Sequence, residues 1–162
     1  MGYKYVIPQI RYYTWTPSFN FQFSFVSLDR TDTPDSLLVG EYQVAGSTAP
    51  RRLVKWELDY TTRKLKTISR IATASWAYCI NIDRMQGAVS ANGKFYISRS
   101  NQDDPGDLYT WKPGYAAHNN AGFLPSSPED LSFDSVRKIF YTLTEALNKR
   151  YILAYKTSQV TF

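Results

Sequence analysis

The sequence predicts an all-β protein built from about three repeated four-stranded units. Aromatic residues make up 16% of the 162 residues, with 13 Tyr, 9 Phe and 4 Trp, and such side chains suit half-buried sheet surfaces. Short runs of strand-forming residues alternate with Gly-, Pro-, Asn- and Asp-rich turns along the chain. A chain of this length forms one domain by default, so residues 1–162 are expected to be a single all-β domain or half-domain.

The first half of the chain contains four runs with strand composition. We expect strands at 21–29, 36–44, 52–59 and 76–82. In the first run Phe21, Phe23 and Phe25 alternate along the chain, so they are expected on one side of the strand. The polar segments "RTDTPD" and "YTTRK" separate the runs and predict turns.

The second half continues the pattern with strands expected at 86–90, 94–100, 107–111, 138–144 and 150–155. Asn92-Gly93 supplies the left-handed backbone of a tight hairpin. The run from Asp104 to Asp107 has Pro and Gly where a type II turn needs them. A helix over "SVRKIFYTLTEALNKRY" competes, because its apolar residues also fall at helical spacing. The Tyr-Thr-Leu-Thr stretch within that segment favours a strand.

Three segments share one plan: a strand, a polar loop, and a strand that ends near an aromatic residue. When Ser27, Ser98 and Thr142 are taken as corresponding points, the separations are 71 and 44 residues. The second separation matches a β-propeller blade of roughly 40–45 residues. The first is longer and requires an insertion or an irregular blade.

The run "KFYISRS" is apolar on both faces, with Phe95 and Ile97 opposite Tyr96. Blades stacked around an axis bury both faces of each small sheet, whereas a sandwich sheet more often has one polar face. This pattern favours a propeller over a sandwich.

The segments "QGAVSANGKFYISRS", "GDLYTWKPG", "PEDLSF" and "TLTE" resemble repeats of uncharacterised secreted microbial proteins of β-propeller type. The resemblance is clearest over residues 76–157. It implies a propeller fold and a secreted protein, although no signal peptide is visible in "MGYKYVIPQI". It implies no activity.

Closed propellers have typically four to eight blades, and this chain supplies about three. The expected architecture is therefore a propeller-like arc that exposes sheet edges and a blade face, and half of a six-bladed propeller is one form of such an arc. We expect a homo-oligomer or a complex with a second propeller-half chain. A piece of a longer protein and a different closed β-fold are the alternatives.

Candidate ligand-binding residues precede or begin the innermost strands, where loops converge at the mouth of a propeller channel. "NIDRMQG" offers Asp83, Arg84 and Gln86, and "SSPEDLSF" offers Glu129 and Asp130 in a matching position. Their oxygens suit a polar ligand or a hard cation such as Ca²⁺, and Arg84 suits a carboxylate. The alternative is that Asp83 and Glu129 only satisfy backbone amides or turns.

Aromatic side chains offer a second way to bind a ligand, because sugar rings stack on exposed Trp and Tyr. Trp15, in "YYTWTPSF", is the candidate for exposure. Trp76, Trp111, Tyr12, Tyr13 and Tyr115 are further members of this set. Trp56 and Trp111 lie in regular strand runs and are expected to pack between blades.

The leading hypothesis is a non-enzymatic module that binds a small polar ligand, plausibly a carbohydrate, without a cofactor. A metal-dependent, lactonase-like hydrolase using Asp83, Glu129 and Asp130 is the alternative, by analogy of fold only.

Other chemistry has little support in the sequence. His118 is the only histidine, so neither a triad nor a zinc site is indicated. The loops "DRTDTPD" and "NQDDPGD" are expected to be turns rather than Ca²⁺ loops. Cys79, the sole cysteine, is expected to be a buried, inert thiol.

The formal net charge of +5 is spread among interspersed acids, so no nucleic-acid partner is expected. No apolar run reaches membrane-spanning length, so no membrane partner is expected either.

Overall fold

The computed structural model describes residues 22–31, 34–62, 64–68, 71–72, 74–102, 104–115, 118–146, 148 and 150–159. Across these residues the protein is all-β: the chain forms antiparallel strands and one short 3₁₀ turn, η1 (Thr157–Gln159). No helix in this part of the chain is long and apolar enough to cross a membrane.

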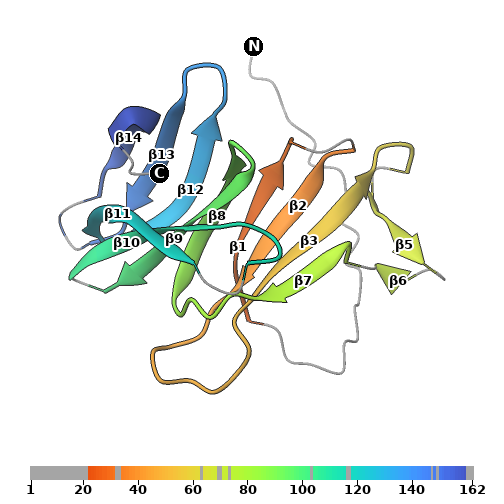
Figure 1. The fold of residues 1–162 in the computed structure, drawn as a ribbon, viewed down its shortest axis with the longest axis horizontal. Coiled ribbons are helices and arrows are strands. Elements are labelled where there is room, and N and C mark those ends of the chain that lie inside the picture. The colour runs from red at the N-terminus through yellow and green to blue at the C-terminus, as the bar shows by residue number, and fades with distance from the viewer. Residues whose placement is uncertain are drawn as a thin grey trace, which may run out of the picture.

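The first sheet is an antiparallel meander in which neighbouring strands follow one another along the chain (Figure 1). Its main strands are β1 (Phe23–Asp29), β2 (Ser36–Glu41), β3 (Arg52–Asp59) and β7 (Trp76–Cys79). Between β3 and β7 the chain adds β4 (Lys64–Leu65), which pairs with the end of β3, and a separate hairpin of β5 (Thr67–Ile68) and β6 (Ile71–Ala72).

The second and third sheets repeat this plan. The second contains β8 (Met85–Ala91), β9 (Lys94–Asn101), β10 (Asp104–Trp111) and β11 (Asn119–Ser126), paired in chain order. The third contains β12 (Pro128–Asp134), β13 (Ile139–Thr144) and β14 (Ile152–Lys156). Among the described residues these three sheets do not close into a ring.

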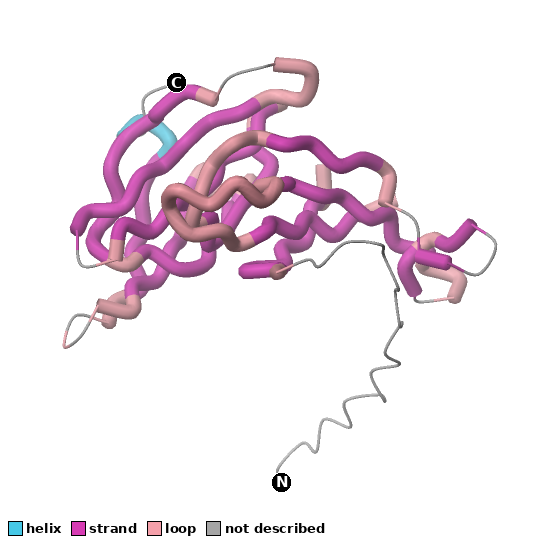
Figure 2. Tube along the Cα trace, turned by 90° about the horizontal axis from the view of Figure 1, so that it is seen from below, coloured by secondary structure: helices cyan, strands magenta, loops and turns pink. Residues whose placement is uncertain are grey.

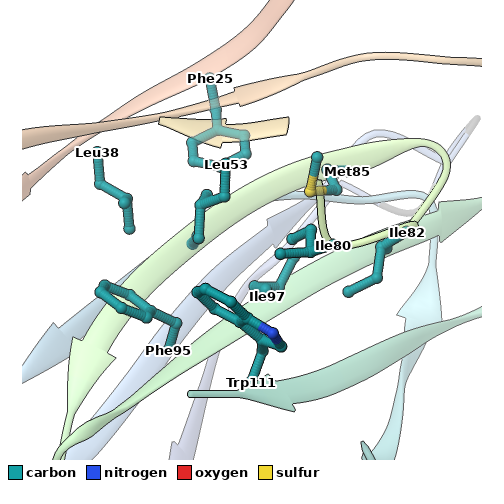
Figure 3. Close-up of a cluster of buried hydrophobic side chains, with 10 residues drawn as sticks. Phe25, Leu38, Leu53, Ile80, Ile82, Met85, Phe95, Ile97 and Trp111 are labelled. Carbon is teal, nitrogen blue, oxygen red and sulfur yellow. The ribbon is translucent and has the colours of Figure 1, made fainter. Parts of the chain in front are cut away.

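The sheets pack face to face, and their first strands meet at the centre of the molecule. Strand β8 contacts both β1 and β12 (Figure 1), and Figure 2 shows that strands make up most of the described chain. One apolar cluster fills the space between the first two sheets, where Phe25 and Leu53 face Phe95 and Trp111 (Figure 3). A second cluster joins the second sheet to the third through residues such as Tyr96, Leu131 and Phe140.

The second sheet is therefore apolar on both faces, as expected from "KFYISRS". Phe95 and Ile97 belong to the cluster shared with the first sheet, and Tyr96 belongs to the cluster shared with the third. All three side chains are buried. Trp111, at the end of β10, belongs to the cluster between the first two sheets, which confirms that it packs between sheets. Trp56 is buried instead with Val39 and Val54 in a third cluster, separate from these two.

A buried ion pair lies at the rim of the first cluster. Lys55 Nζ donates to Asp29 Oδ2 over 2.9 Å, and both side chains are almost completely buried. The ammonium also lies 5.9 Å from the ring centroids of Trp76 and Phe95. Burial acts to raise the pKa of Asp29, but hydrogen bonds from Thr31 and Lys55 outweigh it and lower that pKa.

Two glycines allow the second and third sheets to approach closely. A Cβ at Gly87 would lie 2.4 Å from the backbone nitrogen of Leu131 in β12. A Cβ at Gly106 would lie 2.3 Å from Cγ of Pro128. Real side chains essentially never make contacts this short, so β12 can lie this close to β8 at Gly87, and to β10 at Gly106, only because these positions lack a side chain.

The repeat is real, but its first unit was aligned wrongly from the sequence. Ser98 and Thr142 both lie in the second strand of their sheets, so their separation of 44 residues spans one unit. Ser27 lies instead in β1, a first strand. The first unit is longer because it carries the inserted strands β4, β5 and β6, which fits the expectation of an insertion.

Several local expectations were wrong. The run from Asp104 to Asp107 is not a turn: it belongs to β10, where the pairing with β9 is interrupted by a bulge. The reversal falls earlier, at Gln102, whose φ is 62°. The competing helix does not form, because 139–144 is strand β13. Strand β11 was not predicted, because its Asn- and Gly-rich sequence has weak strand character.

Two side chains lie on unexpected surfaces. A register shift between Phe23 and Phe25 turns them to opposite faces of β1, so Phe23 packs on Trp56 while Phe25 enters the first cluster. Phe21 lies outside the described residues. Cys79 is exposed, because it ends β7, a short strand at the edge of the first sheet.

The close approach at Gly87 predicts a steric cost for any side chain. We expect Gly87→Ala to lower the free energy of unfolding by about 2–3 kcal/mol, because β12 must move away from β8. Chemical denaturation measures this change. The control is Gly93→Ala, at a hairpin with φ of 71° and no atom near the added Cβ, which should cost about 1 kcal/mol for backbone strain alone. Equal costs for the two variants would contradict the packing argument.

Candidate functional site

Three polar side chains occupy equivalent positions at the start of the first strands. Ser24, Gln86 and Glu129 are each the second residue of β1, β8 and β12, and we call them the polar row. Ser24 Oγ donates a hydrogen bond to the carbonyl oxygen of Met85. Gln86 Nε2 donates to Glu129 Oε1 over 3.3 Å. The row therefore crosses all three sheets where their first strands converge.

Glu129 has the most perturbed carboxyl group of the polar row. Its partial burial, and secondarily the negative charge of Glu145, raise its pKa from 4.5 to about 7. The surrounding backbone is fixed, since Ser98 Oγ donates to the carbonyl oxygen of Glu129 over 3.0 Å. Glu129 is therefore held as a carboxyl group that changes its charge near neutral pH.

A hollow of about 290 Å³ lies beside Glu145, at the turn between β13 and β14. The amide of Glu145 donates to the carbonyl oxygen of Ser127 over 3.0 Å, which holds this turn against the start of β12. The side chain of Tyr151 is 57% exposed there. The lining residues are Leu143, Thr144, Glu145, Arg150, Tyr151 and Ile152.

A separate network of charged residues surrounds Arg99. Its Nε donates to Asp83 Oδ1 over 2.6 Å, and its Nη1 donates to Asp107 Oδ2 over 2.7 Å. Arg84 Nη2 donates to Asn101 Oδ1 over 3.0 Å, and Arg84 Nε lies 3.7 Å from Asp83 Oδ2. Burial acts to raise the pKa of Asp83, but the hydrogen bond and charge of Arg99 lower it on balance. This network neutralises its own charges and tethers the ends of β9 and β10.

The structure divides the sequence-predicted site into two groups. Gln86 and Glu129 are in contact, as a shared site requires. Asp83 and Arg84 bind instead to Arg99 and Asn101. Asp83 lies before β8, whereas Glu129 lies within β12, so the two do not occupy matching positions.

Of the two remaining candidate residues, the structure describes Asp130 but not Trp15. The side chain of Asp130 is exposed, and its Oδ1 accepts a hydrogen bond from the amide of Leu131. The alternative in which Pro128, Glu129 and Asp130 form only a turn was wrong, because these residues begin strand β12. Trp15 lies outside the described residues, as do Tyr12 and Tyr13.

The other aromatic candidates contribute mainly to packing. Trp111 is buried, and Trp76 packs on Phe95 and Trp111 with ring centroids 5.5 and 6.3 Å apart. Tyr115 is 62% exposed, and Lys112 Nζ lies 5.8 Å from its ring centroid.

The acidic loops show no metal-binding arrangement in the part of the chain that the structure describes. Within it, no three His, Cys, Asp or Glu side chains lie close enough together to hold a metal ion. Asp107 accepts hydrogen bonds from Arg99 and Asn101, which is a structural role. His118 Nδ1 lies 3.1 Å from the carbonyl oxygen of Ile80. Asp32 and Asp103 lie outside the described residues.

Sequence reasoning missed Ser24, Glu145 and Tyr151. Ser24 would have emerged from an alignment of the three first strands by register, since it matches Gln86 and Glu129. The first strand of the third unit, however, was not recognised as starting at Pro128. Glu145 and Tyr151 come together only through the turn between β13 and β14, and no local sequence motif predicts this turn.

Comparisons with protein-family models, with curated proteins and with solved structures return no match to this chain.

The pKa of Glu129 predicts a pH-dependent stability. Because its folded pKa lies above the unfolded value, stability is greatest at acidic pH and falls as pH rises from about 4.5 through 7. We expect a loss of about 1–2 kcal/mol, allowing for solvent screening at this partly exposed site. Chemical denaturation at a series of pH values measures it. Glu129→Gln should remove this change, whereas Glu145→Gln should only reduce it, because burial is the larger cause. A pH profile that Glu129→Gln leaves intact would contradict the assignment.

The Arg99 network predicts a large structural cost. Arg99→Leu leaves Asp83 and Asp107 without their main cation, so we expect a loss of about 3 kcal/mol in unfolding free energy at neutral pH. Arg137→Leu is the matched control: its ion pair with Asp134 is exposed on the arginine side, so solvent screens it and its loss should change the unfolding free energy far less than the loss of Arg99. Similar losses in both variants would show that the network adds nothing beyond surface charge pairing.

Proposed function

We propose that the three sheets are consecutive blades of a propeller-like arc. Three observations support this: each sheet is a meander in chain order, the first strands lie side by side, and apolar clusters fill the spaces between faces. In this geometry the starts of β1, β8 and β12 form one end of the axial region. The polar row lies at that end.

We propose that the protein is a non-enzymatic binding module that recognises a small polar ligand of the carbohydrate class. The polar row carries the proposal, because it presents a hydroxyl, an amide and a carboxyl group at equivalent places on three converging strands. Sites for small ligands combine a few convergent polar groups with a concave surface. The hollow beside Glu145 supplies that surface, and Tyr151 supplies an exposed ring on which a sugar can stack.

The chemistry of Glu129 suits hydroxyl groups. Above its pKa of about 7 the carboxylate accepts hydrogen bonds from sugar hydroxyls, and charge-assisted bonds of this kind are stronger than neutral ones. Gln86 holds one carboxyl oxygen, which orients the group without neutralising it. A ligand that donates to Glu129 lowers its pKa, so binding is coupled to the release of a proton.

Assembly is a second function, and one observation favours it. The face of the third sheet that points away from the second carries Leu143 and Ile152, which are 40% and 81% exposed. An arc of three blades leaves such a face open, and a further copy of the chain or another propeller half can cover it. Leu143 and Ile152 also line the hollow, so a partner on this face borders the proposed ligand site. We propose that the chain associates with a partner of this kind.

Carbohydrate binding is tested by screening the protein on a glycan array and following hits by calorimetry. We expect Gln86→Ala and Tyr151→Ala each to weaken binding about three- to tenfold, by removing a hydrogen bond or a stacking surface. Affinity should rise with pH through 7 and lose this dependence in Glu129→Gln.

Tyr115→Ala is the control, because Tyr115 is an equally exposed ring in a different loop. It should leave affinity unchanged. An array without hits, together with unchanged tryptophan fluorescence when sugars are added, would overturn the carbohydrate proposal. If affinity falls equally in Tyr151→Ala and Tyr115→Ala, the ligand does not bind specifically beside the polar row, and the proposed site is wrong.

A further inference from the structure

We propose that the outer edge of β14 pairs with the same edge of a second copy, so that two third sheets join into one continuous sheet. This inference rests on the proposed assembly and names the surface responsible for it. The first and second sheets each contain a meander of four strands, whereas the third contains only three, and no described strand pairs with the outer edge of β14 (Figure 1).

The hydrogen bonds at the two ends of β14 reveal which backbone groups face outward. The amide of Thr144 donates to the carbonyl oxygen of Tyr151, and the amide of Thr157 donates to that of Lys138, both over 3.0 Å. In an antiparallel ladder alternate residues point toward the same neighbour. Tyr151, Leu153, Tyr155 and Thr157 therefore bond toward β13, and the backbone groups of Ile152, Ala154 and Lys156 point away from it.

The outward edge is closed at one end and accessible at the other. The amide of Lys156 donates to Gln159 Oε1 over 2.9 Å, so the 3₁₀ turn covers that end of the strand. The accessible edge is thus centred on Ile152 and Ala154. Each of these residues presents one amide and one carbonyl group, the pattern that a neighbouring antiparallel strand requires.

Strand β14 lacks the features that protect sheet edges elsewhere. Protected edges are short, bulged or interrupted by proline and charge. At the edge of the second sheet, β11 contains Pro125, and its pairing with β10 shifts register twice. At the edge of the first sheet, β7 has only four residues. Strand β14 pairs with β13 without any shift, and Lys156 at its end is its only charged residue.

A second copy fits this edge because the edge is complementary to itself. A two-fold axis at Leu153 places Ile152 opposite Ala154 of the second copy, and Ala154 opposite its Ile152, which forms four backbone hydrogen bonds. Residues directly opposite in an antiparallel pair share a face, so the exposed Ile152 side chain meets an alanine. The two Lys156 side chains lie at opposite ends of the pair, each opposite Arg150 of the second copy, so the like charges lie at the ends of the paired segment and not at its centre.

The test is sedimentation velocity on the full chain over a range of concentrations, with hydrogen exchange of the β14 amides. We expect a dimer in which the amides of Ile152 and Ala154 become protected as dimer forms. Ala154→Pro removes an outward N–H and places a ring on the edge, while the ladder to β13 stays intact. It should weaken dimerisation about tenfold or more. Ala154→Thr keeps the N–H and should dimerise like the parent.

The other outcomes separate this inference from the broader assembly proposal. A compact monomer at every concentration would overturn both. A dimer that survives Ala154→Pro but is lost in Leu143→Gln would support stacking through the open face and overturn pairing through the edge. A monomer with protected Ile152 and Ala154 amides would mean that another segment of the same chain covers the edge. Thermal unfolding of each variant establishes that it is folded, and a folded Ala154→Pro that dimerises normally contradicts the inference.

Discussion

The close approach of β8 to β12 determines how the rest of the structure is arranged. Gly87 places the backbone of one first strand against the backbone of the next, at a distance that no side chain permits. The same contact brings Gln86 to Glu129, since these residues lie immediately beside it. Packing of the second cluster follows from this spacing, because Tyr96 and Phe140 can touch, with ring centroids 4.7 Å apart, only when the two sheets are this close.

Charged groups in the interior serve two different purposes. The pair of Lys55 with Asp29 and the network around Arg99 are internally neutralised, so each partner keeps its charge despite burial. Glu129 is different: it has an amide partner but no cation among its described contacts, and a nearby carboxylate opposes its ionisation. A fold optimised only for stability would avoid such a group. A carboxyl group of this kind at converging strand ends is typical of sites that bind or react.

Much of the architecture could be predicted from the sequence, and the failures have physical causes. Strands such as β9 and β13 were found because their aromatic and β-branched residues have strong strand character. The bulges at Ser24 and Pro105 were not visible, because a register shift is decided by pairing between strands rather than by local composition. Gln86 and Glu129 were predicted as site residues. Glu145 was not, because its proximity to Glu129 depends on a contact between separate strands.

The inserted hairpin of β5 and β6 has a consequence for how such a chain can vary. Among the described strands these two pair only with each other, and the meander of the first sheet continues directly from β3 to β7. The connection between the last two strands of a unit is therefore a permissive position, where length changes without disturbing the neighbours. A fluorescent label or an affinity tag inserted there leaves the interior untouched. Length variation at such positions also makes the spacing between units irregular, and regular spacing is how repeats are recognised in a sequence.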